Sequence, residues 1–251
     1  MQLTIYFTPA EVATVRASAL DVYIVIDLIR ATTSMTTILD RGASRIYAAQ
    51  TIEQAQEASR YLPGALLCGE RNALQLPGFD FGNSPVQFLQ AELIGKELVL
   101  TTTNGTRAFF ACPPESVRLA GCFYNAQAVT SYALSQATNL GSNIAIVCAG
   151  EYGYFPLDDA VCAGYLAQML IEQTPTLELH ESVHAALALY QTYAPPKLLE
   201  YCRSARSVIN AGLRADLDIC VTYNASSSIA RVTGKHPHTE LLILERVPIA
   251  L

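Results

Sequence analysis

The chain has 251 residues and a formal net charge of −6, with 51% hydrophobic and 15% charged residues. This length fits one large domain or two small lobes, and the hydrophobic fraction excludes an intrinsically disordered chain. An acidic chain without a basic block is a poor nucleic-acid binder, and no apolar run reaches the roughly 18 residues of a membrane span. We therefore expect a globular protein that binds neither nucleic acid nor membranes.

The N-terminal residues and the cysteines both predict a cytoplasmic protein. Met1 leads directly into QLTIYF, without the basic and apolar regions of a secretory signal. The seven cysteines are an odd number, include no Cys-x-x-Cys pair and mostly lie in apolar runs such as IAIVCAG. Cysteines in that setting are reduced core residues rather than disulfides or metal ligands.

Short apolar runs rich in β-branched residues alternate with longer amphipathic segments along the chain. The predicted strands are 3–7, 22–27, 45–49, 65–69, 97–101, 116–120, 143–149, 218–223 and 241–246. The predicted helices are 31–41, 52–62, 85–92, 105–111, 126–138, 158–173, 181–193 and a segment near 196–205. This alternation predicts an α/β fold with a mixed, mostly parallel sheet covered by helices on both faces, in three layers.

A single domain spanning 1–251 is the simplest organisation, and the only candidate boundary is a weak one near 173–180. The longest stretch without periodicity is ERNALQLPGFDFGNSP, residues 70–85. A loop this long inside a compact domain is usually functional or disordered, and its two phenylalanines argue against disorder.

Polar side chains gather where several predicted strands end, which is the edge at which open α/β sheets bind ligands. Hard oxygen ligands suited to Mg²⁺ occur there, namely Asp27, Glu70, Glu151, Asp158 and Asp159. Groups that bind anions lie beside them, namely Arg30, Arg71, Asn104, Thr106 and Arg107. A cation site next to an anion site is typical of metal-assisted phosphoryl chemistry.

The segment LTTTNGTRAF, residues 100–109, allows three interpretations. Asn104-Gly105-Thr106 fits a glycosylation acceptor, which a cytoplasmic chain would not use. Asn-Gly is a strong turn dipeptide, and a Thr/Asn cluster before a helix is usually only an N-cap. Beside the other polar strand ends, the segment favours a phosphate-binding turn at the start of a helix.

A competing motif lies at His180-Glu-Ser-Val-His184, which matches the H-E-x-x-H pattern of zinc hydrolases. His180 falls at the very start of its predicted helix, and no third histidine follows at the metzincin spacing. We favour a surface helix with two histidines and keep a zinc hydrolase as the less favoured alternative.

Four motifs together resemble the 2-phosphosulfolactate phosphatase family. They are IDLIRATTS (26–34), GERNALQLPGFDFGNSP (69–85), TTTNGTRA (101–108) and DDAVCAG (158–164). The resemblance implies a Mg²⁺-dependent hydrolase that removes phosphate from (2R)-phosphosulfolactate to give sulfolactate, a step toward coenzyme M. A phosphatase for a related phosphorylated acid and a non-catalytic binder of such an acid remain as alternatives.

The resemblance and the strand-end chemistry together assign roles to individual residues. The expected Mg²⁺ ligands are Asp27, Glu70, Asp158 and Asp159, and the expected catalytic residues are Asp27, Arg30 and Arg107. The expected substrate contacts are Arg71, Asn83, Ser84, Thr103, Asn104, Gly105 and Thr106, with Arg71 facing a second anion of the substrate.

The attacking group and the oligomeric state stay open at this stage. Either water or Asp27 itself attacks phosphorus. On this hypothesis, Asp27→Asn and Arg107→Ala each abolish activity while the chain still folds. A homodimer is a further expectation, because the chain is apolar for its size.

Overall fold

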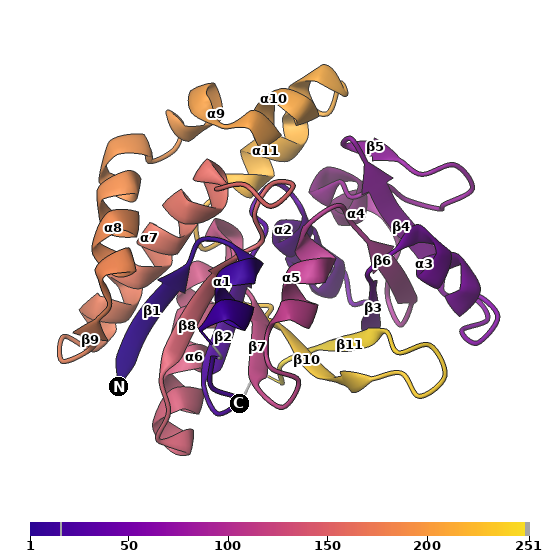
Figure 1. Cartoon of the computed structure of the whole chain (residues 1–251). Helices are drawn as coiled ribbons and strands as arrows, with labels where there is room; N and C mark the ends of the chain where they lie inside the picture. The colour runs from indigo at the N-terminus through magenta and orange to yellow at the C-terminus, as the bar shows by residue number, and fades with distance from the viewer. Residues whose placement is uncertain (16, 249–251) are drawn as a thin grey trace.

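The computed structural model describes residues 1–15 and 17–248. Its strands are β1 (Gln2–Tyr6), β2 (Val22–Ile26), β3 (Arg45–Ala49), β4 (Leu66–Arg71), β5 (Leu74–Gln75), β6 (Glu97–Thr101), β7 (Val117–Ala120), β8 (Ile144–Cys148), β9 (Glu178–Leu179), β10 (Ala230–Lys235) and β11 (Leu242–Arg246). They form one mixed sheet in the order β5-β4-β6-β3-β11-β10-β7-β2-β8-β1-β9 (Figure 1).

Helices surround this sheet. They are α1 (Pro9–Thr14), α2 (Ala31–Asp40), α3 (Ile52–Ala58), α4 (Pro85–Gln90), α5 (Gly105–Ala111), the 3-10 turn η1 (Phe123–Asn125), α6 (Ala126–Leu140), α7 (Leu157–Gln173), α8 (Glu181–Tyr193), α9 (Leu198–Tyr201), α10 (Arg203–Asn210) and α11 (Arg214–Cys220). Among the described residues, no helix is both long and apolar enough to cross a membrane.

The sheet consists of two parallel groups joined by an antiparallel hairpin. One group is β7-β2-β8-β1-β9 and the other is β3-β6-β4, while β10 pairs with β7 and β11 pairs with β3, both antiparallel. In a flat sheet, three antiparallel steps would point the carboxyl ends of the two groups in opposite directions. The β10–β11 hairpin carries a register shift between Val232 and Gly234, and such bulges increase local twist. The sheet curls there, and the carboxyl ends of both groups meet at the top of Figure 1.

The inner concave side of the curled sheet holds α2 and α5. One buried cluster joins Val25 of β2 and Leu98 of β6 to Met35 of α2 and Phe109 of α5. These two helices therefore pack against both parallel groups at once, and the joins that precede them open onto the same end of the sheet.

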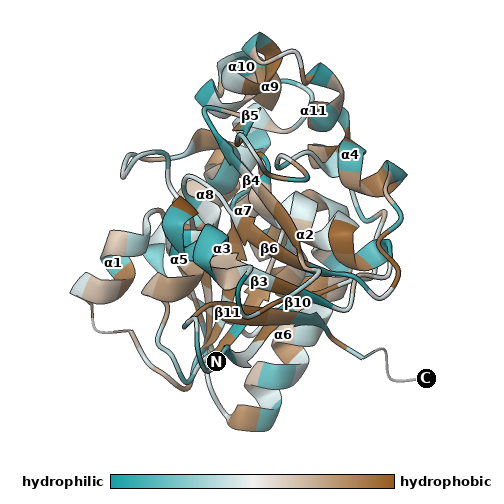
Figure 2. Cartoon of the chain, turned by 90° about the vertical axis from the view of Figure 1, so that its right-hand side faces the viewer, coloured by the Kyte–Doolittle hydropathy of each residue, from teal (hydrophilic) through white to brown (hydrophobic). Residues whose placement is uncertain are grey.

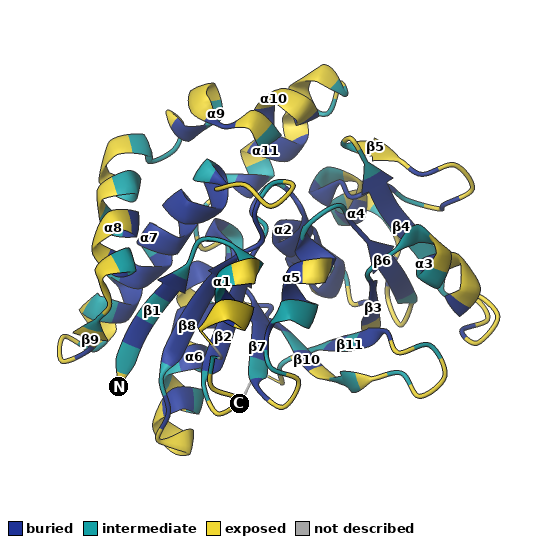
Figure 3. Ribbon diagram, viewed as in Figure 1, coloured by how far each residue is buried: buried dark blue, intermediate teal, exposed yellow. Residues whose placement is uncertain are grey.

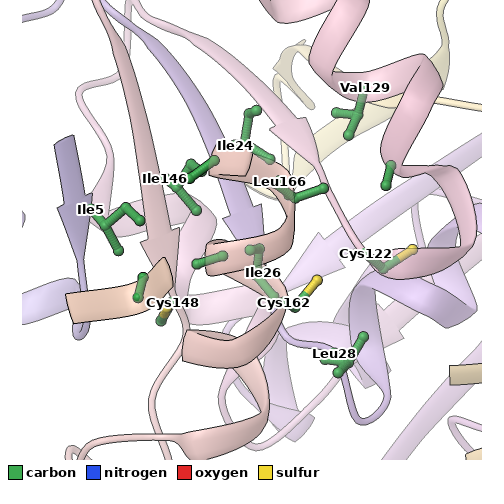
Figure 4. Close-up of a cluster of buried hydrophobic side chains, with 14 of the residues drawn as sticks. Ile5, Ile24, Ile26, Leu28, Cys122, Val129, Ile146, Cys148, Cys162 and Leu166 are labelled. Atoms are coloured by element: carbon green, nitrogen blue, oxygen red, sulfur yellow. The ribbon is translucent and has the colours of Figure 1, made fainter. Parts of the chain in front are cut away.

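Helices α6 and α7 cover the outer face of the first group. Side chains alternate along β2, so that Ile24 and Ile26 contact this outer core while Val25 points to the inner one. Figure 4 shows the outer core, in which Leu166 of α7 and Val129 of α6 lie over the strand residues. Figure 3 shows α7 buried beneath α8, whose outer face is exposed. Figure 2 shows hydrophobic residues along the strands and hydrophilic residues on α10.

The predicted α/β fold with a mixed, mostly parallel, covered sheet is confirmed, and the predicted bounds of α5 and α8 match the structure. The strand predicted at 218–223 is wrong, because α11 runs through Cys220. The segment DICVTY has β-forming residues, but Asp216, Leu217 and Cys220 bury one helical face. Strands β5, β9 and β10 and helices α1 and α11 were not predicted, and the segment near 196–205 is two helices, α9 and α10.

Candidate functional site

A cavity of about 370 Å³ lies where the carboxyl ends of the two parallel groups meet. The joins after β2, β4 and β6 form its floor, the loop after β8 forms one rim, and α10 forms the opposite wall. Of the predicted site residues, the structure brings Asp27, Arg30, Glu70, Asn83, Thr103 and Asn104 to this cavity.

Asp27 follows the buried strand β2 and lies half-buried on the cavity floor. The backbone N–H of Ala31, in the first turn of α2, donates to its Oδ1 at 3.3 Å. A Cβ on Gly105 would lie 2.5 Å from Asp27 Oδ2, so the start of α5 touches this carboxylate. Burial raises the pKa of Asp27 to about 7, with Asp158 and Glu70 adding negative charge nearby, while the Ala31 hydrogen bond opposes the shift.

Glu70 connects the β4–β5 turn to the end of β6. Its Oε1 accepts hydrogen bonds from the backbone N–H and the hydroxyl of Thr103, both at 2.9 Å, and its Oε2 accepts one from Ala73 N–H at 3.1 Å. A carboxylate has about four acceptor positions; three are used here, so one lone pair, on Oε2, remains for a ligand in the cavity.

Arg30 is the buried cation of the cavity. Its Nη1 donates to Asp216 Oδ2 of α11 at 2.7 Å, and its Nη2 donates to the carbonyl of Ala73 at 2.7 Å. Both side chains of this ion pair are only 2% exposed. A guanidinium has five N–H donors, and within the described residues only two of them have partners.

Asp158 and Asp159 open α7 but do not line the cavity. Asp159 accepts from Leu28 N–H at 2.8 Å and from Ala149 N–H at 3.0 Å, which ties the ends of β2 and β8 together. Burial, with Asp158 and Asp27 adding negative charge, raises the pKa of Asp159 well above its usual range. Burial, with Glu151 adding negative charge nearby, likewise raises the pKa of Asp158 to about 6. The structure therefore gives Asp159 a connecting role, rather than the predicted place among cavity-facing carboxylates.

Sequence reasoning named Glu151 of the β8–α7 loop, which lines the cavity, but it missed Tyr152 of that loop and the whole wall made by α10. Ser204 and Ser207 of α10 and Tyr152 of the loop line the cavity, and Arg203 Nε lies 3.5 Å from Glu151 Oε1 across it. The signal available in the sequence was the polar i, i+3 spacing of the two serines on a short amphipathic helix.

Five predicted contacts do not line the cavity. Arg107 is exposed and its Nε donates to Gln50 O, while Arg71 donates to Glu70 O and more weakly to the Thr101 hydroxyl. The other three take structural positions: Ser84 caps α4, Gly105 packs on Asp27, and Thr106 exchanges hydrogen bonds with Thr102.

The two histidines of the H-E-x-x-H motif belong to no metal-binding cluster among the described residues. The ring of His180 caps α8 by accepting from Ser182 N–H at 3.2 Å, and His184 is exposed on the same helix. Across residues 1–15 and 17–248, no three His, Cys, Asp or Glu side chains gather closely enough to enclose a metal ion by themselves. This geometry favours the surface-helix interpretation of the motif.

A buried arginine and two facing carboxylates at the carboxyl edge of the sheet define an α/β enzyme of the class that acts on small anions. The chain belongs to the 2-phosphosulfolactate phosphatase family, because the family model described as 2-phosphosulpholactate phosphatase matches residues 6–235. This confirms the resemblance that the four motifs indicated and makes the chain a member of a family of phosphoric monoester hydrolases.

Similar proteins in other organisms carry the same family name. The chain is 33% identical over 221 residues to a probable 2-phosphosulfolactate phosphatase of Clostridium acetobutylicum, covering 87% of this chain and 91% of that protein. It is 35% identical over 214 residues to one of Thermotoga maritima, covering 84% and 89%. It is 35% identical over 201 residues to one of Caldicellulosiruptor saccharolyticus, covering 79% and 83%.

Proposed function

We propose that this chain is a Mg²⁺-dependent phosphatase that hydrolyses the phosphate ester of a small phosphorylated acid, with phosphosulfolactate as the substrate. The main observation in favour of this proposal is that Arg30, Asp27 and Glu70 all line one cavity. Its volume of about 370 Å³ is at the small end of ligand pockets, which suits a compact metabolite. The names of the relatives support phosphosulfolactate in particular.

The charge balance of the cavity supports a cation. Three carboxylates line it, from Asp27, Glu70 and Glu151, against the two guanidinium groups of Arg30 and Arg203. Asp216 offsets part of the Arg30 charge from behind. A substrate with several negative charges would meet an acidic cavity unless a cation accompanies it.

The residues of the cavity fit a Mg²⁺ ion that has only a few protein ligands, as is typical of that ion. Mg²⁺ commonly uses one or two carboxylates, with waters and substrate phosphate completing its coordination, so the lack of a closed three-ligand cluster is compatible with it. Asp27 and Glu70 would hold it, and the buried Asn83 Oδ1, which has no partner among the described residues, is a further hard oxygen at the cavity. Bound Mg²⁺ would act as a Lewis acid on phosphate oxygens.

The other steps of the proposed reaction are assigned to residues of the chain itself. The free N–H donors of Arg30 are placed to bind equatorial phosphate oxygens, whose charge grows as the ester bond breaks. Asp27 either attacks phosphorus, expelling the substrate alkoxide and forming an aspartyl phosphate that water then hydrolyses, or takes the proton of the water that attacks phosphorus as the alkoxide leaves. Tyr152 bridges the rim, because its N–H donates to Asn104 Oδ1 and its hydroxyl donates to Asn72 Oδ1, both at 3.3 Å.

The direct test is a phosphate-release assay over phosphosulfolactate, phospholactate, phosphoglycolate and phosphoglycerate, with EDTA-treated protein and with added Mg²⁺. We expect release from phosphosulfolactate that is lost after EDTA and restored by Mg²⁺. Activity that persists undiminished after complete removal of divalent cations would contradict the metal proposal. Tight binding of the esters without any release would instead identify a non-catalytic binder.

A further inference from the structure

We propose that Asp216 of α11 is a positioning residue that fixes the Arg30 guanidinium in the orientation that binds phosphate. The inference rests on the proposed function, because it assigns Arg30 to the phosphate. It assigns a functional role to a residue of α11, a helix that does not line the cavity and in which the sequence motifs placed no functional residue.

Asp216 is held on several sides and is 1% exposed. Its Oδ2 accepts from Arg30 Nη1 at 2.7 Å, and its Oδ1 accepts from the Ser84 hydroxyl at 2.5 Å and from Val86 N–H at 3.4 Å. Ser84 and Val86 belong to the start of α4, directly after the 70–85 loop. One carboxylate thus ties α11, α4 and the β2–α2 join together.

Asp216 acts through Arg30, because it does not line the cavity itself. It holds one arm of the guanidinium fork, while the carbonyl of Ala73 holds the other arm. The fork is planar and rigid, so two fixed arms determine where the remaining N–H donors point. A misplacement of about 1 Å in such a group costs on the order of 10²-fold in rate.

A purely structural ion pair is the competing explanation, since removing one partner of a buried pair destabilises a fold whether or not the pair has a catalytic role. The two explanations predict different values of kcat/KM for the folded Asp216 variants. If the pair is only structural, substitution of Asp216 lowers the stability of the protein, but the molecules that remain folded keep a normal kcat/KM. If Asp216 positions Arg30, its substitution lowers kcat/KM in fully folded protein, and it has no further effect once Arg30 has been replaced.

The first experiment compares Asp216→Asn with Asp218→Asn, an exposed aspartate of the same helix that pairs with Arg214. In protein shown to be folded by circular dichroism, we expect Asp216→Asn to lower kcat/KM by about 10- to 100-fold, with Asp218→Asn unchanged. Asp216→Glu keeps the charge but shifts the carboxylate, so it serves if the asparagine variant does not fold, with a loss of about 10-fold or more expected. Normal kcat/KM in folded Asp216→Asn or Asp216→Glu overturns the proposal.

The second experiment is a cycle with Arg30→Lys and a chemical rescue. We expect Arg30→Lys/Asp216→Asn to lose no more activity than the worse single variant, whereas additive losses overturn the proposal. Low concentrations of guanidinium chloride should restore activity to Arg30→Ala but not to Arg30→Ala/Asp216→Asn. Equal rescue in both also overturns it.

Inorganic phosphate separates failure of this inference from failure of the proposed function. We expect the wild-type chain to bind phosphate by calorimetry and Asp216→Asn to bind it about 10-fold more weakly or worse. If the wild type binds phosphate but hydrolyses no ester, the proposed function fails and the phosphate affinities still decide the role of Asp216. If the wild type binds no phosphate, both fail.

Discussion

Gly105 sets how closely α5 can approach the cavity floor. A Cβ there would lie 2.5 Å from Asp27 Oδ2 and 2.6 Å from the Cβ of Ala31. We expect Gly105→Ala to displace Asp27, to lower kcat/KM by about 10²-fold and to cost about 1–3 kcal/mol of stability through overpacking. Steady-state phosphate release and urea unfolding measure the two effects. Gly234→Ala is the matched control, because an added Cβ there meets nothing within 4 Å; equal behaviour of the two variants would contradict the argument.

The structure predicts different effects on activity for substitutions of Arg107 and Asp27, although the sequence suggested that both residues are essential. Arg107 is exposed and turned toward Gln50 O, whereas Asp27 faces the cavity. We expect Arg107→Ala to keep kcat/KM within about threefold, in line with a surface substitution, and Asp27→Asn to abolish phosphate release. Complete loss of activity in folded Arg107→Ala would show that α5 rearranges when substrate binds.

The strand-end rule explains which site residues the sequence could reveal. Asp27, Glu70 and Asn104 lie at or just beyond the carboxyl ends of strands, so their place at the edge of the sheet follows from chain connectivity alone. The direction of a side chain one helical turn further on does not, which is why the sequence could not show that Arg107 lies against Gln50 O rather than at the cavity. The role of Asp216 could not be predicted from the sequence for another reason, because its partner Arg30 is 186 residues away along the chain.

At the scale of elements, α7 and α8 pack unusually closely at Gly164. A Cβ on Gly164 would overlap the carbonyl oxygen of Ala186 in α8. Alanine normally favours a helix interior over glycine by about 1 kcal/mol, so any net destabilisation reports the overlap. We expect Gly164→Ala to lose about 1–3 kcal/mol, measured by urea unfolding. Glu172→Ala, on the exposed end of α7, should stay within about 0.5 kcal/mol. A more stable Gly164→Ala protein would mean that the helices separate without cost.

The sequence predicted well those elements whose apolar residues follow a single clear pattern. Strands β2 and β8 are buried at every position and read as continuous apolar runs. Strand β10, by contrast, alternates buried and exposed residues and contains Gly234 and Lys235, which weaken a strand pattern. Of the strands that were not predicted, β10 is the one that helps to join the two parallel groups, so the curl of the sheet could not be predicted.

At the scale of the whole molecule, the cavity needs both parallel groups, because Asp27 comes from one and Glu70 from the other. The hairpin and the inner helices α2 and α5 connect the groups through one shared core. A site built in this way favours a chain that unfolds as one unit, rather than as lobes separated near 173–180.

The seven free cysteines can test this cooperativity, because all of them are buried. Burial raises the pKa of Cys112 to about 12, and a buried, protonated thiol reacts only after the structure around it opens. Cys68 lies in β4 of one group, Cys148 in β8 of the other, and Cys202 between α9 and α10 beyond residue 180. We expect pulsed alkylation in increasing urea, read by mass spectrometry, to label these three thiols at one shared midpoint. Labelling of Cys202 or Cys68 at clearly lower urea than Cys148 would instead show that the molecule opens in separate parts, and that the cavity forms only when those parts dock.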